Sequence, residues 1–237
     1  RLMGSFAEDC AEHYQFTREE QDAYAIASLE GALAAQTDGR FAAEIAPVTI
    51  GTRKGEVTVD SDEQPRQARP DKIPSLKPAF RRDGTITPAN ASSISDGAAA
   101  LVMAREGTAE ARGLEVRARV LGHASHAQAP GWFTTAPIPA IRKCLERVGW
   151  SVADVDLWEI NEAFAVVPMA AARELGIPRE RLNVNGGACA LGHPIGASGA
   201  RILVTLLHAL EEKGLRRGVA SLCIGGGEGT AVAIERV

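Results

Sequence analysis

One histidine in this sequence lies where a catalytic group could act. His193 sits between Gly192 and Pro194, inside the glycine-rich stretch 185–199 that joins an expected strand to an expected helix. Glycines at the start of a helix let another group come close to the backbone. An imidazole in such a turn is suited to proton transfer. A lone histidine is more often a satisfied structural residue, so the turn, rather than the residue type, favours a functional role.

A cysteine at the end of an apolar strand is the second candidate. Cys223 precedes Gly225, and the glycine-rich run ends at Gly229. A thiol can act as an acid or a base, and closely spaced backbone N–H groups can stabilise an oxyanion. The alternative is a buried cysteine ahead of a tight hairpin. A phosphate-binding loop is excluded, because the Lys-Ser/Thr ending and the following helix are both missing.

The third candidate is the stretch Asn161-Glu-Ala-Phe164, which follows an expected strand. Either Asn161 or Glu162 could simply cap the next helix. Polar side chains at the carboxyl ends of strands are also where α/β folds bind ligands. We therefore treat Asn161 as a candidate site residue.

The cysteines do not indicate a metal site or a disulfide framework. Cys189 and His193 are four residues apart and Cys223 could join them, but no Cys-x-x-Cys pair exists, so we expect no metal. Free thiols suit a reducing compartment, and we expect a cytoplasmic protein. The four cysteines are Cys10, Cys144, Cys189 and Cys223.

Composition sets wider limits on the class of protein. The chain has 237 residues, of which 45% are hydrophobic, enough for one large domain or two small ones. Its formal net charge is −4 without long runs of one sign, so we expect no nucleic-acid partner. The apolar runs are too short to span a membrane, and we see no secretory signal. The chain begins at Arg1, so it is processed or lacks its start.

The hydrophobic pattern predicts an α/β fold with buried strands. Thr17-Arg-Glu-Glu20 is a capping box, which predicts a helix over 17–36. The segment 90–104 is either a buried helix, capped by Ser95 or Asp96, or a core strand. The other expected helices are 5–16, 138–148, 164–175 and 197–212, and the expected strands are 45–50, 56–59, 116–120, 155–160, 182–185, 218–224 and 229–237.

The three candidate stretches together resemble the thiolase family. The resemblance rests on their order and separation as well as their residues, and it extends over nearly the whole chain. It implies a Claisen condensation of two acyl-CoA molecules, or the reverse, with coenzyme A thioesters as substrates and no separate cofactor. The matching stretches are 161–164, 186–199 and 223–229, with further similarity at 18–22, 76–80, 90–92 and 96–100.

The resemblance also implies a role for each candidate residue. Cys223 matches the acid/base that removes the α-proton of acetyl-CoA. His193 matches the group that activates a nucleophilic cysteine and helps to bind the thioester oxygen. Asn161 matches a residue that holds a water in the same oxyanion hole, and the N–H of Gly225 matches a donor of a second hole. For Cys223 to act as a base, we expect neighbours such as His193 to lower its pKa.

Further residues match the family's coenzyme A and acyl-group sites. Phe133 falls where related short-chain enzymes often have Met; it either shortens the acyl pocket or packs its loop onto the core. Arg66 lies in a polar, proline-containing stretch, 60–74, whose basic residues are either solvated or in contact with a phosphate. The matching residues are Ser92 for the pantetheine arm, Phe80 for an apolar wall, Arg66 for the nucleotide end, and Phe133, Ala163 and Phe164 for the substrate site.

This sequence differs from the family pattern in one respect. Family members carry a further segment, with the nucleophilic cysteine, before the point that matches Met3-Gly4. None of the four cysteines here takes that place, so we expect a fragment or one piece of a split protein. We expect 1–93 to be most of the loop domain that binds coenzyme A, 94–115 an element returned to the missing N-terminal half, and 116–237 the C-terminal half, a layered αβα unit whose mixed sheet has helices on both faces.

Three functions follow as expectations, and the first leads. The complete protein would join two acetyl-CoA molecules into acetoacetyl-CoA, or run the reverse thiolysis, as a homodimer or homotetramer. The second is thiolysis of longer 3-ketoacyl chains in fatty-acid degradation. The third is a coenzyme A-binding or scaffold protein without catalysis, which would need none of Asn161, His193 and Cys223.

Overall fold

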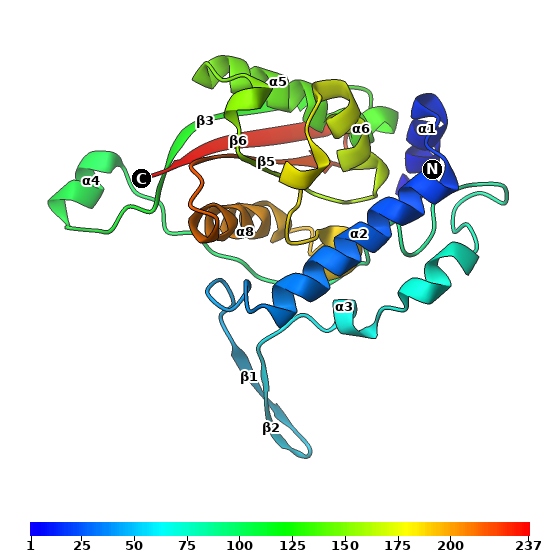
Figure 1. The fold of residues 1–237 in the computed structure, drawn as a ribbon, viewed down its shortest axis with the longest axis horizontal. Coiled ribbons are helices and arrows are strands. Elements are labelled where there is room, and N and C mark those ends of the chain that lie inside the picture. The colour runs from blue at the N-terminus through cyan, green and yellow to red at the C-terminus, as the bar shows by residue number, and fades with distance from the viewer.

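The computed structural model describes residues 1–237 and contains a four-stranded mixed sheet (Figure 1). The strands are β3 (Ala118–Ala127), β4 (Leu157–Ile160), β5 (Arg217–Ile224) and β6 (Glu228–Arg236), in the order β3-β6-β5-β4. The β4 and β5 strands run parallel, and the other two pairings are antiparallel. The predicted mixed sheet and the final hairpin pair are therefore confirmed.

Helices cover both faces of this sheet. The α5 helix (Pro137–Val148) packs on one face beside α6 (Val166–Leu175), and α8 (Ser198–Glu212) packs on the other (Figure 1). Alternating strand residues serve the two faces, as the period of a β-strand requires. On β5, Val219 joins the core under α5, while Ala220 joins the core over α8. The resulting αβα unit is the predicted one.

The N-terminal helices lie beside the sheet unit. The α1 helix (Met3–Tyr14) is followed by α2 (Arg18–Thr37), which starts at the predicted capping box: the Thr17 hydroxyl accepts from the Glu20 N–H, and the Glu20 carboxylate accepts from the Thr17 N–H. One face of α2 packs on the short α7 helix (Ala188–Leu191). A long helix from the first part of the chain thus contacts the glycine-rich stretch 185–199, which lies near the end of the sequence.

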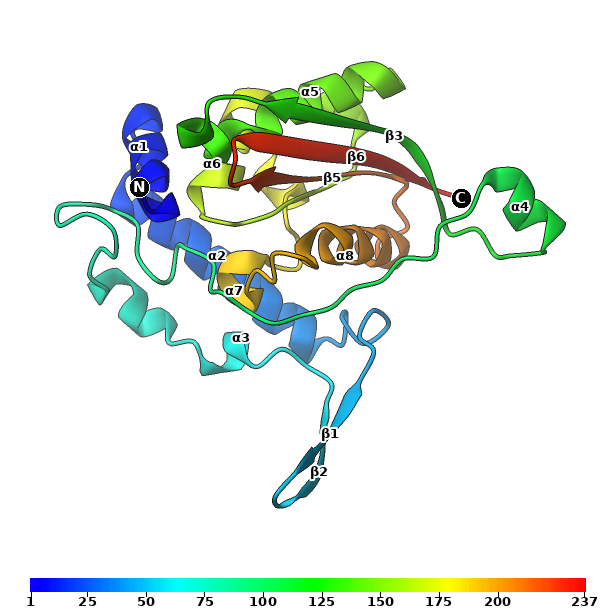
Figure 2. The ribbon, with the colours of Figure 1, turned by 180° about the vertical axis from the view of Figure 1, so that it is seen from behind.

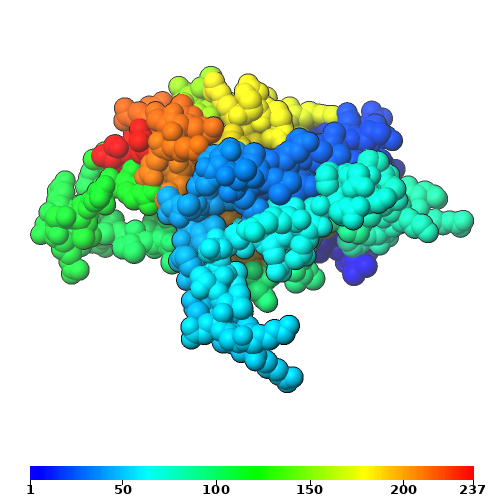
Figure 3. All heavy atoms as spheres, turned by 60° about the horizontal axis from the view of Figure 1, so that its bottom comes forward, coloured from blue at the N-terminus to red at the C-terminus, as the bar shows by residue number.

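A hairpin and a loop follow α2. The β1 (Val48–Thr52) and β2 (Gly55–Val59) strands pair antiparallel, close to the predicted bounds, and project from the body of the molecule (Figures 1 and 3). The next stretch is mostly loop, as predicted, with one turn of helix in α3 (Gln64–Gln67) and a 3₁₀ segment, Pro70–Ser75.

The prediction for residues 90–104 is wrong. Residues 95–105 form neither a helix nor a strand and run extended past α7 and α8 to the short α4 helix (Glu106–Ala111) (Figure 2). The side chains of Ile94 and Val102 are both 98% exposed. Their hydrophobicity predicted a core element, but no complementary surface within this chain covers them.

The predicted strand 182–185 is also wrong. Only one isolated bridge links Leu182 to Trp158, because Asn183 has a left-handed φ of 48° that breaks the extended run. The Asn183 side chain instead bonds both backbone groups of Ile160, accepting from its N–H at 2.8 Å and donating to its carbonyl at 2.9 Å. The asparagine thereby extends the edge of β4 without a further strand.

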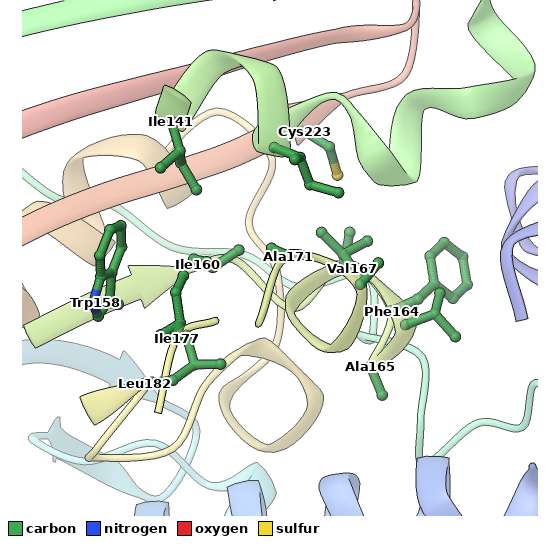
Figure 4. Packing of buried hydrophobic residues seen from close by; sticks show 14 of the residues in the cluster. Ile141, Trp158, Ile160, Phe164, Ala165, Val167, Ala171, Ile177, Leu182 and Cys223 are labelled. Carbon is green, nitrogen blue, oxygen red and sulfur yellow. The ribbon is translucent and has the colours of Figure 1, made fainter. Parts of the chain in front are cut away.

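The hydrophobic core under α5 fixes the end of the sheet where the candidate residues lie. Trp158 and Ile160 of β4 pack with Ile177 and Leu182, and Cys223 of β5 joins the same cluster (Figure 4). All five are at most 6% exposed.

No helix is both long and apolar enough to cross a bilayer.

Candidate active site

Two of the predicted residues meet at the end of β4. Asn161 follows the last residue of β4 and is held by its own N–H, which donates to Ser221 on β5 at 2.9 Å. His193 follows the turn after α7. The Asn161 amide nitrogen lies 3.3 Å from the His193 Nε2 atom, although the two residues are 32 positions apart. The fold therefore joins two stretches that the sequence could only nominate separately.

Ser198 fixes which ring nitrogen of His193 carries the proton. The Ser198 hydroxyl, fully buried, donates to the Pro194 carbonyl at 3.0 Å. The hydroxyl has only this one hydrogen, so the Ser198 oxygen must accept a hydrogen bond from His193 Nδ1, 2.5 Å away. The Nε2 atom then carries no proton, and its lone pair accepts a hydrogen bond from the Asn161 amide. An imidazole in this tautomer can take a proton at Nε2.

Electrostatics keep this ring neutral. Burial lowers the pKa of His193 below its usual value, and the positive charge of Arg201 lowers it further. A neutral imidazole is the form that a general base requires.

The remaining polar atom of Asn161 has no partner. Its Oδ1 atom is buried and accepts no hydrogen bond, and the residue is 1% exposed. A buried acceptor without a donor is uncommon and costs free energy. The residue therefore has capacity left for a small donor such as a water molecule, which is the role that the family resemblance implies.

Cys223 lies one strand away from Asn161. It is 6% exposed and packs beside the aliphatic side chains of α6, including Val167 (Figure 4). Burial, with a smaller contribution from the nearby Cys10, raises the pKa of the thiol to about 12. This contradicts the expectation that His193 lowers the pKa of Cys223, because apolar atoms surround the sulfur and remove the solvation of its anion. Cys223 rests as a neutral thiol.

Gly225 presents a free backbone donor. It is the first residue of the turn between β5 and β6, and its N–H donates to no backbone or side-chain acceptor, whereas the N–H of Gly227 closes the turn on Ile224 at 3.1 Å. An unpaired N–H next to Cys223 is suited to hold a developing negative charge.

Aromatic side chains line the region beside these groups. The Phe164 ring lies 6.1 Å from the Phe80 ring and 6.3 Å from the Phe133 ring, edge to face in both pairs. Phe133 is 2% exposed and also meets Phe6 at 6.5 Å. The predicted apolar residues therefore cluster, and Phe133 packs firmly in its loop. The neighbouring Trp132 is 38% exposed and meets His13 instead.

The other predicted binding residues divide into two groups. Ser92 is tied to the 161–164 stretch, because both its N–H and its hydroxyl donate to the Ala163 carbonyl, at 3.1 and 3.0 Å. Arg66 lies apart on the exposed side of α3 and donates to the Ser61 hydroxyl. The structure thus joins Ser92 to the site and leaves Arg66 in solvent.

The sequence analysis missed two residues of this network. Ser198 could have been found from its place five residues after His193 in the same glycine-rich turn. Glu162 was treated only as a helix cap, but neither Glu162 nor Asn161 caps α6, whose start has no side-chain cap. Its four hydrogen-bond partners come from three distant segments, which no local pattern reveals. No three histidine, cysteine or acidic side chains gather in a metal-binding arrangement.

Comparison with known proteins agrees with this fold. Sequence models of the thiolase N-terminal domain and the thiolase C-terminal domain match residues 1–107 and 114–236. The chain belongs to the thiolase family.

Individual relatives are similar over almost the whole chain. An acetyl-CoA acetyltransferase of Allochromatium vinosum is 50% identical over 99% of this chain and 60% of its own length. The crystal structure of the Bacillus anthracis acetyl-CoA acetyltransferase, 48% identical, superposes with a TM-score of 0.97 over 100% of this chain and 60% of that one. Human mitochondrial 3-ketoacyl-CoA thiolase, 38% identical, has a TM-score of 0.93 over 99% and 60%. The chain thus spans about 60% of the length of these relatives.

Proposed function

We propose that this chain is the C-terminal part of an enzyme that joins two acetyl-CoA molecules into acetoacetyl-CoA and catalyses the reverse thiolysis. The observation that carries the proposal is the hydrogen-bonded row Asn161–His193–Ser198, one strand away from the thiol of Cys223. A protein that only bound coenzyme A or served as a scaffold would need no neutral histidine with an unprotonated Nε2 beside an asparagine whose Oδ1 is unsatisfied. That arrangement favours catalysis over the scaffold alternative.

His193 and Asn161 would serve the acylation step. The free Nε2 atom of His193 can take the proton of a nucleophilic thiol. The resulting imidazolium then donates from the same atom to the thioester oxygen, where negative charge develops. The unsatisfied Oδ1 of Asn161 can hold a water that donates to the same oxygen. Donors aimed at a developing oxyanion are commonly worth about 3 kcal/mol each.

The raised pKa of Cys223 determines the order of its proton transfers. A neutral thiol cannot begin as a base, but it can protonate the thiolate of the coenzyme A that leaves during acylation. The Cys223 thiolate formed in that transfer then removes the α-proton of the second acetyl-CoA. The proton returns Cys223 to its neutral state, and the Gly225 N–H is placed to hold negative charge nearby.

The acetyl group is the acyl chain that the comparisons favour. The relatives at about 50% identity are named acetyl-CoA acetyltransferases, whereas the 3-ketoacyl-CoA thiolase is 38% identical. The buried Phe133, packed between Phe6 and Phe164, is in keeping with a short pocket. Thiolysis of longer 3-ketoacyl chains remains the second candidate.

The nucleophile would come from a segment that the relatives possess and the 237 residues do not include. Cys10, Cys144 and Cys189 are all buried, and burial raises the pKa of each thiol, which makes them poor nucleophiles. We further propose that the complete protein is a cytoplasmic homodimer or homotetramer whose substrates are coenzyme A thioesters and whose chemistry needs no metal.

A fusion protein tests this function. The N-terminal segment of the Bacillus anthracis enzyme, up to the point that matches Met3, would be joined to this chain, and thiolysis of acetoacetyl-CoA would be followed for the fusion and for the 237 residues alone. We expect turnover by the fusion, none by the chain alone, and loss of turnover in the fusion carrying His193→Ala. Turnover by the chain alone, or a folded fusion that neither cleaves nor forms acetoacetyl-CoA, would contradict the proposal.

A further inference from the structure

A buried carboxylate next to the catalytic asparagine has no part in the reaction described above. Glu162 is 0% exposed, and its two oxygens receive four hydrogen bonds. Oε1 accepts from the Tyr24 hydroxyl at 3.0 Å and from the Asn183 amide at 2.8 Å. Oε2 accepts from the Ser28 hydroxyl at 2.7 Å and from the Cys189 N–H at 3.0 Å.

This set of partners matches a carboxylate, which only accepts. The Cys189 N–H and the Asn183 amide can only donate, and the Ser28 oxygen already accepts from the Gly187 N–H at 2.9 Å, so its hydrogen points to Glu162. No arginine or lysine forms an ion pair with this carboxylate. A buried charge without such a pair is costly unless its hydrogen bonds are complete, so all four bonds have to form together.

On one side, these bonds hold the segment that ends at His193. Glu162 binds the N–H of Cys189 directly, and through Ser28 it binds the N–H of Gly187. These N–H groups lie at the start of α7, whose four residues lead to Gly192 and His193. The fit is close, because a Cβ atom on Gly187 would lie 2.3 Å from the Glu162 carboxyl carbon. The carboxylate therefore fixes where the His193 turn begins.

On the other side, the same carboxylate holds the segment that carries Asn161. Glu162 is its direct neighbour in the chain, and its partner Asn183 bonds both backbone groups of Ile160. Asn161 is thus anchored on both sides. Tyr24 and Ser28 connect the carboxylate to a third element, because both lie on α2.

We propose that Glu162 is a positioning residue for the thiolase reaction. By binding the start of α7, the edge of β4 and α2 at once, its carboxylate sets the distance between Asn161 Nδ2 and His193 Nε2, which is 3.3 Å. The proposal rests on the function proposed above. It adds that α2, through Tyr24 and Ser28, governs a catalytic geometry to which it contributes no reacting group.

The test uses the active fusion enzyme with Glu162→Gln and a matched control, Glu8→Gln. Glu8 is also a buried carboxylate, 4% exposed, and it accepts from the N–H groups of Thr85 and Ile86 without touching a site residue. We expect Glu162→Gln to lower kcat about 100-fold with little change in KM, because small misplacements of catalytic groups have effects of this size. Glu8→Gln should lower the melting temperature but leave kcat near that of the parent.

A milder variant covers the case in which Glu162→Gln does not fold. Ser28→Ala removes one donor to Glu162 and the acceptor of the Gly187 N–H, on a helix that contributes no reacting group in the proposed reaction. We expect it to lower kcat by about 10-fold, again without a matching change in KM. Equal losses of kcat in the Glu8 and Glu162 variants, or an unchanged kcat in folded Ser28→Ala, would overturn the positioning role.

A spectroscopic measurement separates this proposal from the proposed function. The imidazole ¹⁵N resonances of His193, one of five histidines, report its tautomer and its bonds to Asn161 and Ser198. They should shift in the Glu162 and Ser28 variants and stay unchanged in Glu8→Gln. If the parent fusion proved inactive, the function would fail, but these spectra would still support or overturn the positioning of His193 by Glu162.

Discussion

The sheet unit and the extended segment 94–105 bury similar apolar residues to very different degrees. In the sheet unit, Ile160 and Leu182 are both 0% exposed, whereas Ile94 and Val102 of the extended segment are both 98% exposed. The side chains do not differ enough in hydrophobicity to explain this. The difference lies in whether a complementary surface exists within the chain, since burial is a property of two surfaces rather than one.

The contrast can be set beside the domains predicted from the sequence, which stay a prediction. The sheet unit falls within the expected C-terminal half, 116–237, and the extended segment within the element expected to return to an N-terminal half, 94–115. We propose that such a half covers the segment in the complete enzyme.

The first prediction concerns the packed region. In the fusion enzyme, Cys223→Ala should slow exchange of the acetyl-CoA α-proton with solvent by about 10²- to 10⁴-fold, the usual contribution of an acid/base group. Acylation of the nucleophile should be slowed less and remain detectable by mass spectrometry, because in the proposed reaction His193 activates the nucleophile and Cys223 only protonates the leaving coenzyme A. Equal loss of both steps would show that Cys223 has only a structural role or that the two roles overlap.

The second prediction concerns the exposed region. Replacing Val102 and Met103 together by serine should destabilise the fusion enzyme by a few kcal/mol, since burying each side chain is worth about 1.5–3 kcal/mol. The isolated chain should gain solubility from the same change, as judged by light scattering, because the parent chain exposes these side chains at 98% and 71%.

The hairpin supplies a matched control for that change. Val48 and Val59 are also exposed, at 59% and 48%, and pair with each other across β1 and β2. Serine at both positions should leave the melting temperature of the fusion nearly unchanged. The contrast between the regions would be wrong if both pairs destabilised the fusion equally, or if the isolated parent chain were a stable, cooperatively folding monomer.

The third prediction concerns acyl length. If Phe133 limits the pocket, Phe133→Ala should shift the preference of the fusion enzyme from acetoacetyl-CoA toward 3-ketohexanoyl-CoA by about 1–3 kcal/mol in kcat/KM. If Phe133 only packs its loop between Phe6 and Phe164, stability should fall and the preference should stay. A parent enzyme that already prefers the longer substrate would favour the degradative thiolase.

The fourth prediction concerns a charge inside the packed region. Glu159, 2% exposed, has its pKa raised to about 8 by burial, which outweighs Arg201 at 3.9 Å. The usual pKa is 4.5, so between these values the folded chain holds a proton that the unfolded chain releases. Stability should therefore fall as the pH rises through this window, by at most about 1.4 kcal/mol per pH unit.

Urea unfolding of the fusion at about pH 5 and about pH 8 measures this slope. Glu159→Gln should make this slope less steep, because the glutamine cannot lose a proton. Asp154 offers a control: it is an exposed carboxyl whose pKa the Ser151 hydroxyl lowers, so Asp154→Asn should leave the fall between these pH values in place. An identical slope in the parent and in Glu159→Gln would refute the assignment.

Local sequence was sufficient wherever the physical cause was local. The capping box at Thr17 fixed the start of α2, and alternating apolar residues fixed the two faces of β5. The glycine-rich turns pointed to His193, Cys223 and Gly225 as candidates, and their roles stay predictions. The family resemblance then supplied roles that no local rule could assign.

The errors and omissions share a different cause. Hydrophobicity predicted a core element over 90–104, although no surface in this chain covers Ile94 or Val102. Asn183 ended a predicted strand because its left-handed φ and side-chain bonds to Ile160 prevailed over strand propensity. The pKa of Cys223 was expected to fall and instead rises to about 12, because burial depends on which atoms surround the sulfur.

The sequence by itself therefore determined most of the elements, the family and the residue types of the proposed reaction. Only the tertiary structure decided which nitrogen of His193 carries no proton, because the single hydroxyl hydrogen of Ser198 is donated to the Pro194 carbonyl and the Ser198 oxygen therefore accepts from Nδ1. It also decided that Glu162 joins three distant segments through four hydrogen bonds. The reason is physical: residue types and periodicity act over a few neighbours, whereas burial and hydrogen-bond completion depend on groups that only folding brings together.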